Sequence, residues 1–314
     1  MMMDPLKIAP RDVIGETLVE VAKQDTRLVV LDADLGRSTR LTAFETQFPE
    51  RYLQFGVAEQ NAIGFASGLV YSGWHPVFVT FTMFSIGLGW TQIRQAAYAG
   101  LPLTIIGTHP GFDIGPDGGT HQMLEDIALA RVIPEIEVLT PSDNLETAAA
   151  IKQGITSPRV TFIRVGRHPI PILHEPPVEF VIGKAEVLFQ SGGDYVLIAD
   201  GSMVYDVLNV AKRLTTEGHS CCVINIRSIK PIDEDLIIAL MGRAKLTITI
   251  ENHTIFGGLG SAVAEIAAQN GRRLLRIGSP DCFGRSADTD TLRHMVGLDA
   301  DSIYKKIKQF ICET

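Results

Sequence analysis

Residues 58–81 read AEQNAIGFASGLVYSGWHPVFVTF, and this stretch decides the fold class. Its first part, residues 58–71, is rich in small and apolar residues, and we expect a helix there. Residues 76–81 are a short apolar run with β-branched and aromatic side chains, which predicts a buried strand. A helix that leads through a short turn into a buried strand is the repeating unit of a parallel α/β sheet. The chain is therefore expected to be an α/β protein.

An overlapping stretch resembles a membrane span in composition. Residues 69–90 contain no Asp, Glu, Lys or Arg over 22 residues, and a spanning helix needs about 20 apolar residues. Gly73, His75, Pro76 and several Thr and Ser side chains interrupt the stretch. A buried strand followed by a helix in an α/β core explains it better, so no membrane contact is expected.

The alternation of strand and helix continues along the whole chain. Strands are predicted at residues 28–31, 76–81, 103–107, 137–139 and 160–165, and then at 195–199, 222–226, 246–251 and 274–277. Helices are predicted at residues 11–23, 58–71, 90–98 and after the N-cap Asp143, and then at 203–214, 233–240, 259–270 and 302–310. Residues 166–178 carry four prolines, which favour an extended linker. We predict two domains, each a mainly parallel sheet flanked by helices, at residues 1–175 and 191–314, with a linker at 176–190.

The composition is that of an acidic globular protein. The 314 residues include 28 Lys and Arg against 36 Asp and Glu, a formal net charge of −8, so nucleic acid and anionic membranes are not expected as partners. The four cysteines form no C-x-x-C pair, which argues against a disulfide scaffold and against common zinc or redox sites. Residues 1–12 contain no apolar run that would indicate a signal peptide. We therefore expect a cytoplasmic protein.

Two polar segments of the first half lie where ligands bind open α/β sheets, near the carboxyl ends of strands. Residues 32–38 (DADLGRS) follow the strand at 28–31 and suit either a ligand or a helix cap. Glu59 begins the helix at 58–71, where a carboxylate also suits the helix dipole. The small apolar residues around Glu59 predict burial, and a buried carboxylate usually has a partner. We therefore favour a functional role for Glu59.

The segment after the strand at 103–107 is the most unusual in the chain. Residues 108–122 read THPGFDIGPDGGTHQ, with two His, two Asp and four Gly. Glycines let the backbone approach a ligand closely, and His and Asp side chains bind or exchange protons near neutral pH. The H-x11-H spacing matches no standard zinc site. We interpret this segment, which we call the histidine loop, as a substrate-binding loop.

Seven motifs together resemble one family. They are ADLGRS (33–38), FGVAEQNAIGFASGL (55–69), TFTMF (80–84), QIRQ (92–95), GTHPGFDIGPDGGTHQMLEDIAL (107–129), LTPSD (139–143) and GGLGSAVAE (257–265). Over essentially all 314 residues, the chain resembles the C-terminal half of transketolase, a thiamine-diphosphate enzyme. The resemblance implies a pyrimidine-binding domain followed by the transketolase C-terminal domain. The histidine loop is the most specific of these motifs, whereas GGLGSAVAE is shared with related families.

The resemblance implies a set of residues that contact thiamine diphosphate. Glu59 matches the family glutamate that hydrogen-bonds N1′ of the cofactor aminopyrimidine, so it is expected to be catalytic through proton relay. Phe84 matches the aromatic side chain that stacks on the aminopyrimidine, and Phe81 lies in the same wall. Without the resemblance, both phenylalanines would be interpreted as core residues. Asp34 matches an acid near the cofactor and the dimer contact.

The resemblance also implies how a sugar phosphate is held. Three residues match contacts to the sugar, of which the histidines also count as catalytic: His109, His121 and Asp117. Three more match contacts to its phosphate: Ser38, Arg167 and Arg11. A guanidinium group suits bidentate phosphate contact. Arg164 lies close in the sequence and competes for the role given to Arg167.

The motif that holds the cofactor diphosphate in the family is absent from this sequence. It consists of GDG and a downstream Asn-containing segment that bind Mg²⁺ and the diphosphate, whereas Asp117-Gly118-Gly119 here belongs to the histidine loop. No metal ligands are therefore expected in this chain. The resemblance implies the second subunit of a split transketolase, in which an N-terminal-type partner supplies the Mg²⁺ ligands within an α2β2 assembly. The expected reaction transfers a two-carbon glycolaldehyde unit between ketose and aldose phosphates.

Three other functions fit parts of the pattern. The β subunit of a 2-oxo-acid dehydrogenase shares the glutamate and the C-terminal domain, but the histidine loop favours sugar recognition. A deoxyxylulose-phosphate-synthase-like enzyme usually lacks the histidine at position 109 and keeps both halves in one chain. A regulatory subunit would keep only the fold, which does not explain why Glu59, His109, Asp117 and His121 occur together.

The second half of the chain offers weaker signals. Residues 251–253 (ENH) and 257–260 (GGLG) suit either an anion site at a helix start or close helix–sheet packing, and packing is favoured. His174 and four other histidines outside these motifs are expected to be surface or hydrogen-bonded core residues.

Overall fold

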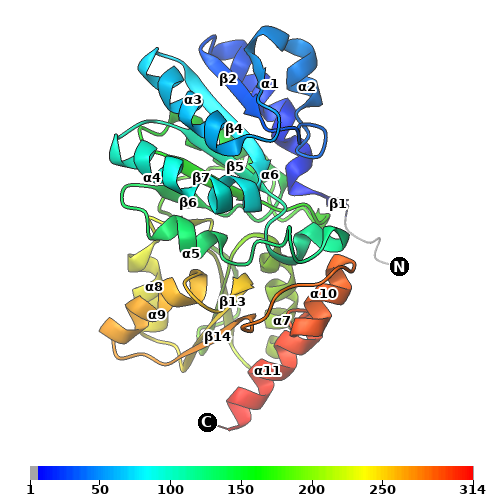
Figure 1. Ribbon diagram of the computed structural model, residues 1–314. Coiled ribbons are helices and arrows are strands. Elements are labelled where there is room, and N and C mark those ends of the chain that lie inside the picture. Colours follow the sequence, from blue (N-terminus) through cyan, green and yellow to red (C-terminus); the bar gives the residue numbers. More distant parts are fainter. Residues whose placement is uncertain (1–5, 314) are drawn as a thin grey trace.

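The computed structural model describes residues 6–313, and its first domain is built on a seven-stranded sheet. The strand order is β12–β6–β7–β5–β4–β2–β3, and every pair is parallel except β12 with β6. Figure 1 shows this domain in the upper half of the molecule. The strands are β2 (Leu28–Asp32), β3 (Tyr52–Gln54), β4 (His75–Phe81), β5 (Thr104–Thr108), β6 (Glu137–Leu139), β7 (Thr161–Val165) and β12 (Ser228–Lys230). The predicted mainly parallel α/β sheet is confirmed.

Helices cover both faces of this sheet, because successive side chains of a strand point to opposite faces. In β4, Val77 and Val79 pack against α1 and α6, whereas Phe78 packs against α3 and α4 on the other face. A parallel sheet buried on both faces explains why its strands are continuous apolar runs. The helices of this domain are α1 (Ile14–Gln24), α2 (Thr42–Gln47), α3 (Glu59–Tyr71), α4 (Trp90–Tyr98), α5 (Asp126–Arg131) and α6 (Asn144–Thr156).

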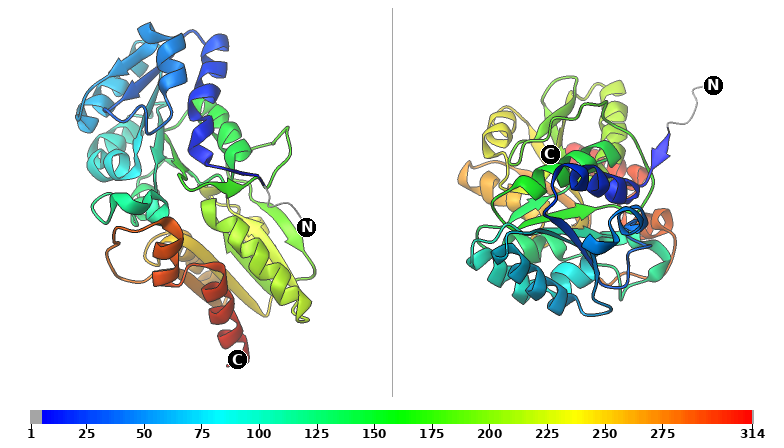
Figure 2. Two further views of the ribbon diagram at one scale, coloured as in Figure 1. Left: turned by 90° about the vertical axis from the view of Figure 1, so that its right-hand side faces the viewer. Right: turned by 90° about the horizontal axis from the view of Figure 1, so that it is seen from above.

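The second domain has the same layered arrangement around five strands. Their order is β14–β13–β10–β11–β9, and only β9 is antiparallel to its neighbour. The strands are β9 (Glu186–Gln190), β10 (Tyr195–Ala199), β11 (Cys221–Asn225), β13 (Leu246–Thr254) and β14 (Leu274–Ser279). The helices are α7 (Val204–Thr216), α8 (Glu234–Met241), α9 (Leu259–Gln269), α10 (Thr289–Val296) and α11 (Ala300–Cys312). In Figure 2, α11 lies at the end of the molecule far from the first domain.

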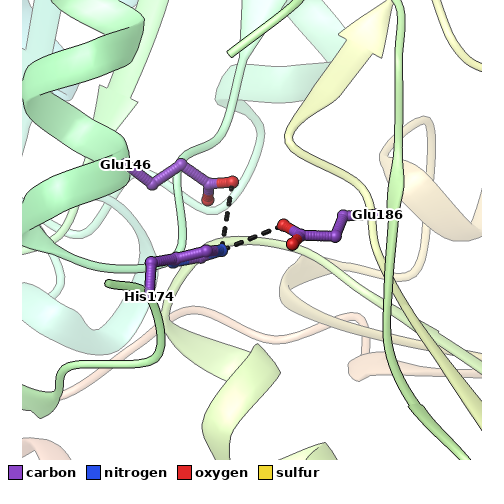
Figure 3. A group of neighbouring side chains, drawn as sticks. All are labelled: Glu146, His174 and Glu186. Atoms are coloured by element: carbon purple, nitrogen blue, oxygen red, sulfur yellow. Dashed lines mark hydrogen bonds and ion pairs between the residues drawn. The ribbon is translucent and has the colours of Figure 1, made fainter. Parts of the chain in front are cut away.

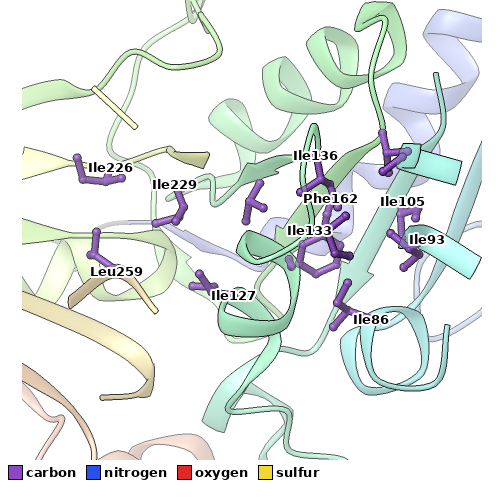
Figure 4. Close-up of a cluster of buried hydrophobic side chains, with 14 of the residues drawn as sticks. Ile86, Ile93, Ile105, Ile127, Ile133, Ile136, Phe162, Ile226, Ile229 and Leu259 are labelled. Carbon is purple, nitrogen blue, oxygen red and sulfur yellow. The ribbon is translucent and has the colours of Figure 1, made fainter. Parts of the chain in front are cut away.

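The two domains share a hydrophobic core, and one strand from the second half of the chain joins the sheet of the first domain. Ile127 and Ile133 of the first domain belong to the same buried cluster as Leu259 of the second, as Figure 4 shows. After β11 the chain crosses over, and β12 pairs antiparallel with β6 at the edge of the first sheet. Strand β9 occupies the last five residues of the expected linker at 176–190. This strand pairs with β11 at the edge of the second sheet.

Several short elements were not predicted from the sequence. They include a π-helical segment, η3 (Met83–Leu88), the helices α2, α5 and α10, and strand β3. The remaining short elements are β1 (Lys7–Ile8) paired with β8 (Ile170–Pro171), and the 3₁₀ turns η1 (Pro10–Val13), η2 (Pro49–Arg51), η4 (Gly111–Asp117) and η5 (Gly201–Met203). The expected N-cap is confirmed, since Asp143 accepts a hydrogen bond from the backbone of Glu146 at 2.7 Å. Between residues 6 and 313, no helix has both the length and the apolar composition needed to cross a bilayer.

Candidate active site

The candidate residues converge because they follow neighbouring parallel strands. Ser38 follows β2, Phe81 ends β4 and His109 directly follows β5. These strands are adjacent, and β7, which precedes Arg167, lies next to β5. Phe81 is in register with Thr108 across β4 and β5. Their carboxyl ends therefore form one edge, which is where ligands bind in open α/β sheets.

Aromatic rings form a continuous wall at this edge. Phe81 and Phe84 stack with ring centroids 6.0 Å apart and an interplanar angle of 12°. The His109 ring lies 3.9 Å from that of Phe81, and the His121 ring meets Phe84 edge-on at 5.5 Å. Phe84 belongs to the π-helical segment directly after β4. The structure thus brings both histidines and both phenylalanines together, and the wall suits a planar aromatic ligand.

Arg11 connects Ser38 to His109. Its Nη1 atom lies 2.7 Å from Nε2 of His109 and donates to the carbonyl oxygen of Ser38 at 2.9 Å. A guanidinium group only donates, so Nε2 of His109 accepts and the ring proton lies on Nδ1. That Nδ1 atom is 2.7 Å from Oγ1 of Thr108. Arg11 therefore fixes the tautomer of His109.

The charges around His109 favour an anionic ligand. Burial, and then the positive charges of Arg11, Arg167 and Arg40, lower the pKa of His109 to about 2, so the ring is neutral. Burial also lowers the pKa of Arg11, to about 10, which leaves Arg11 charged at neutral pH. Three guanidinium groups near a neutral, buried histidine suit an anion such as a phosphate.

Arg167, which follows β7, forms a partly exposed ion pair with Asp117 of the histidine loop. Nη1 of Arg167 donates to Oδ2 of Asp117 at 2.9 Å and to the carbonyl oxygen of Ile114 at 2.8 Å. Arg164 points elsewhere, since its side chain is 3% exposed and its Nε atom donates to Asp126 at 2.6 Å. Arg167 is therefore the more accessible of the two candidate arginines.

Glu59 is the first residue of α3, and its side chain is buried. Across residues 6–313, its carboxylate forms no hydrogen bond or ion pair with another residue. Helix α3 packs against β4 and the π-helical segment, which carry Phe81 and Phe84. The oxygens of Glu59 are not among the fully buried polar atoms that lack a hydrogen bond, so the carboxylate end of this buried residue still reaches solvent. Glu59 is therefore available to a ligand that donates a hydrogen bond.

In the segment 32–38, one residue stabilises the local turn and others are accessible to a ligand. Asp32 accepts hydrogen bonds from the backbone of Leu35 at 3.1 Å and Gly36 at 3.0 Å, so Asp32 stabilises the turn. Asp34 has a left-handed backbone with φ of 63° and lines a hollow of about 200 Å³ together with Ser38. Within the described residues, the Asp34 carboxylate forms no hydrogen bond or ion pair. Asp34 and Ser38 thus remain accessible for a ligand.

Two residues that hold the histidine loop were not predicted to do so: Asn252 was expected in a packing segment or an anion site, and Arg293 had no expected role. Asn252 lies in β13 and Arg293 in α10, and both bind Asp113 of the loop. Helix α10 did have sequence signals, because Asp288 caps it and Gly297 ends it with φ of 72°. The contacts themselves join residues that are 139 and 180 positions apart, which local patterns do not reveal.

The glycines at 257–260 serve close packing. A side chain at Gly258 or Gly260 would lie within 2.1 Å or 2.7 Å of the Glu251 carboxylate. Gly260 donates its backbone N–H to that carboxylate at 2.9 Å. The glycines let α9 approach β13, so the favoured packing interpretation describes this motif.

A group of acids around His174 has the spacing of a metal site. Glu146, His174 and Glu186 bring ligand atoms within 4.8 Å of one another (Figure 3). Burial acts to lower the pKa of His174, but hydrogen bonds to Asp143 and Glu186 raise it to about 10. Arg227 also lies 3.4 Å from Glu146. Because an imidazolium and a guanidinium already neutralise these acids, we interpret the group as a buried ion network between the domains.

Comparisons with known proteins show the family of the chain. Residues 7–171 match the family model "Transketolase, pyrimidine binding domain", and residues 183–303 match "Transketolase, C-terminal domain". The chain is 42% identical over 300 residues to a Methanocaldococcus jannaschii protein named as a transketolase C-terminal section, covering 94% of both sequences. It is 37% identical to a 6-deoxy-6-sulfo-D-fructose transketolase subunit of a Clostridium species, covering 94% of this chain and 92% of that protein.

A solved structure is similar over the whole fold. It is described as a split-gene transketolase in an inactive β4 tetramer, and it superimposes with a TM-score of 0.89 at 36% identity. The match covers 96% of this chain and 98% of that one. We conclude that the chain belongs to the transketolase family and consists of the pyrimidine-binding and C-terminal domains that form the C-terminal half of a transketolase.

Proposed function

We propose that this chain is the second subunit of a split, thiamine-diphosphate-dependent transketolase. In the proposed reaction, the C2–C3 bond of a ketose phosphate breaks, and the two-carbon glycolaldehyde unit forms a new bond to the aldehyde carbon of an aldose phosphate. The donor leaves as a shortened aldose phosphate. The observation that carries this proposal is the strand edge at which the aromatic wall, Arg11 and Arg167 meet, together with the Glu59 carboxylate, which no residue between 6 and 313 engages in a hydrogen bond or ion pair.

The residues of this chain fit the aminopyrimidine end of the cofactor. Phe84 and Phe81 offer a flat face for a planar ring. Within the described residues, no hydrogen bond or ion pair engages the Glu59 carboxylate, so it is available to hold a proton at a ring nitrogen. We further propose that Asp34 lies near the cofactor. When bound, thiamine diphosphate supplies the electron sink that breaking a carbon–carbon bond beside a carbonyl requires.

The substrate is proposed to bind between the histidine loop and the arginines. The phosphate would be held by Arg11, Arg167 and Ser38. The sugar hydroxyls would be held by His109, His121 and Asp117. Because Arg11 donates to Nε2 of His109, an incoming phosphate competes with that ring for the guanidinium group. Phosphate binding therefore leaves Nε2 of His109 open to a sugar hydroxyl.

We propose that a partner chain holds the diphosphate and Mg²⁺ in a cytoplasmic α2β2 assembly. Large apolar side chains of α3, of the residues just before it and of the π-helical segment are exposed: Phe65 is 49% exposed, Val57 80% and Leu88 51%. Gln60 of α3 donates to the carbonyl oxygen of Leu88 at 3.1 Å, which joins α3 and the π-helical segment into one surface. Exposed apolar patches of this kind mark protein interfaces. Relatives described as a transketolase subunit and as a split-gene transketolase support separate chains.

The test is reconstitution with the partner that carries the GDG and Asn-containing motif. The mixture should transfer glycolaldehyde units from a panel of ketose phosphates when thiamine diphosphate and Mg²⁺ are present. Glu59→Gln should abolish most of this activity, whereas the matched variant Glu16→Gln, at an exposed position in the first turn of α1, should not. Full turnover by the chain without a partner would overturn the split-subunit proposal.

The same reconstituted pair distinguishes the rival functions. Release of CO₂ from pyruvate in the presence of glyceraldehyde phosphate would indicate a deoxyxylulose-phosphate-synthase-like enzyme. Oxidation of a 2-oxo acid by an artificial electron acceptor would indicate a dehydrogenase subunit. Activity that survives Glu59→Gln would indicate a regulatory chain that keeps only the fold.

A further inference from the structure

The histidine loop contains several glycines whose backbone conformation must be held by contacts with other parts of the chain. Gly111, Gly115 and Gly118 all have positive φ, at 56°, 66° and 86°. Glycine populates such conformations readily, but it also loses the most conformational entropy when a structure fixes it. A loop with this many permissive positions needs contacts from elsewhere to hold one conformation. In this structure, those contacts come mainly from the second domain.

Asn252 is the main contact beneath the loop. Its Oδ1 accepts from the backbone N–H of Phe112 at 3.0 Å, and its Nδ2 donates to Oδ1 of Asp113 at 2.8 Å. A side chain at Gly111 would come within 2.5 Å of both oxygens of Asn252. Asn252 is 1% exposed. The Asn252 amide therefore accepts from one group of the loop and donates to another. An aspartate could only accept, and an alanine could do neither.

Arg293 of α10 holds the same loop from a second direction. Its Nη2 atom donates to Oδ1 of Asp113 at 2.7 Å and to Oγ of Ser202 at 2.8 Å. Asp113 is thus clamped between Asn252 and Arg293, both in the second domain. Charge-assisted hydrogen bonds in a buried site are strong and geometrically specific.

The far end of the loop also rests on the second domain. Nε2 of Gln122 donates to the carbonyl oxygen of Arg285 at 2.8 Å, and the Ser286 hydroxyl donates to the carbonyl oxygen of Pro116. A side chain at Gly119 would meet the carbonyl oxygen of Gly284 at 2.7 Å. Both ends of the segment between His109 and His121 are therefore fixed by residues of the second domain.

We propose that the second domain positions the substrate-binding loop, and that Asn252 and Arg293 are positioning residues for sugar recognition. This inference rests on the proposed function only for the identity of the substrate. Asp117 lies four positions after Asp113 in the same loop, so loosening the clamp displaces the carboxylate assigned to the sugar without touching the sugar itself. The second domain then has a direct role in the active site.

The first test does not depend on catalysis. Hydrogen–deuterium exchange of the full chain should show the amides of residues 111–122 exchanging roughly tenfold faster in Asn252→Ala than in the natural chain. The matched control is Asn225→Ala. Asn225 is also fully buried and joins the domains through Ser142 and Glu146, but it does not contact the loop. Unchanged exchange in Asn252→Ala, or equal acceleration in Asn225→Ala, would overturn the proposal.

The second test uses the reconstituted complex. Asn252→Ala should raise KM for the ketose phosphate roughly tenfold with little change in the Kd of thiamine diphosphate, and Arg293→Lys should be milder than Arg293→Ala. If Asn252→Ala does not fold, Asn252→Asp replaces it, because it keeps the acceptor for Phe112 and loses the donor to Asp113. If the loop amides exchange faster in Asn252→Ala but the reconstituted complex has no transketolase activity, the proposed substrate is refuted and the positioning role of Asn252 is retained. Equal losses in Asn225→Ala would refute the positioning role.

Discussion

Replacing His174 with glutamine should destabilise the chain by about 2–4 kcal/mol near pH 6 and by much less near pH 10. The side chain is 8% exposed, and its two ring nitrogens face Asp143 at 2.8 Å and Glu186 at 3.0 Å. Burial acts to lower its pKa, but these hydrogen bonds raise it from 6.5 to about 10. At about 1.4 kcal/mol per pKa unit, this rise sets an upper limit of about 5 kcal/mol. Glu186 is 35% exposed, and solvent weakens its share, which gives the lower figure.

The direction of the pH dependence follows from the raised pKa. The folded chain holds the imidazole proton more tightly than the unfolded chain, where the histidine has its ordinary pKa of 6.5. The stabilisation is therefore fully present below pH 6.5 and is lost as the pH rises through about 10.

Urea unfolding of the chain and the variant across this pH range measures the difference. His294→Gln is the control, because His294 also pairs with an acid, Asp299 at 3.1 Å, but is 77% exposed. An exposed pair should contribute less than about 1 kcal/mol. A difference for His174→Gln that stays below about 1 kcal/mol near pH 6, or that is constant up to pH 10, would refute the reasoning.

Two further predictions concern the buried acid of the second domain and the phosphate site. Burial raises the pKa of Glu251 from 4.5 to about 8, so the folded state binds the proton more tightly and stability should fall as the pH rises through this window. Glu251→Gln keeps an acceptor for the backbone N–H of Gly260 and should reduce this loss of stability. Urea unfolding midpoints of the chain and the variant near pH 5 and pH 8.5 measure the difference. An equal fall of both midpoints between these pH values would contradict the prediction. Arg11→Gln should raise KM for a ketose phosphate by roughly 10-fold or more and change KM for the unphosphorylated ketose much less, because it removes a charged donor. Equal effects on both substrates in the reconstituted complex would show that Arg11 does not read the phosphate.

Much of the fold was predictable because its signals are local. The buried strands are short apolar runs between helical segments, and helix α4 was predicted at the residues where it occurs. Strand β9 and strand β12 were not predicted, because each is a short edge strand whose place depends on a neighbour far away in the sequence. The π-helical segment also lacked a signal, since its sequence, MFSIGL, is compatible with an ordinary helix.

The segments that form the site were predictable from the sequence, but the contacts between them were not. Strand ends pointed to residues 32–38 and to the histidine loop, and the structure brings Phe81, Phe84, His109 and His121 into one wall. The hydrogen bond from Arg11 to His109 spans 98 positions and depends on the packing of separate elements. The roles proposed for Asn252 and Arg293 required the second domain to be placed against the loop, which no local pattern encodes.

The decisive measurement is transketolase turnover by this chain alone, by the partner alone and by their mixture, each with thiamine diphosphate and Mg²⁺. The proposed shared active site predicts turnover only in the mixture, and a loss of at least about 100-fold when Glu59 is replaced by glutamine. Turnover by the unaccompanied chain, or a mixture that keeps its rate with Glu59→Gln, would contradict the account.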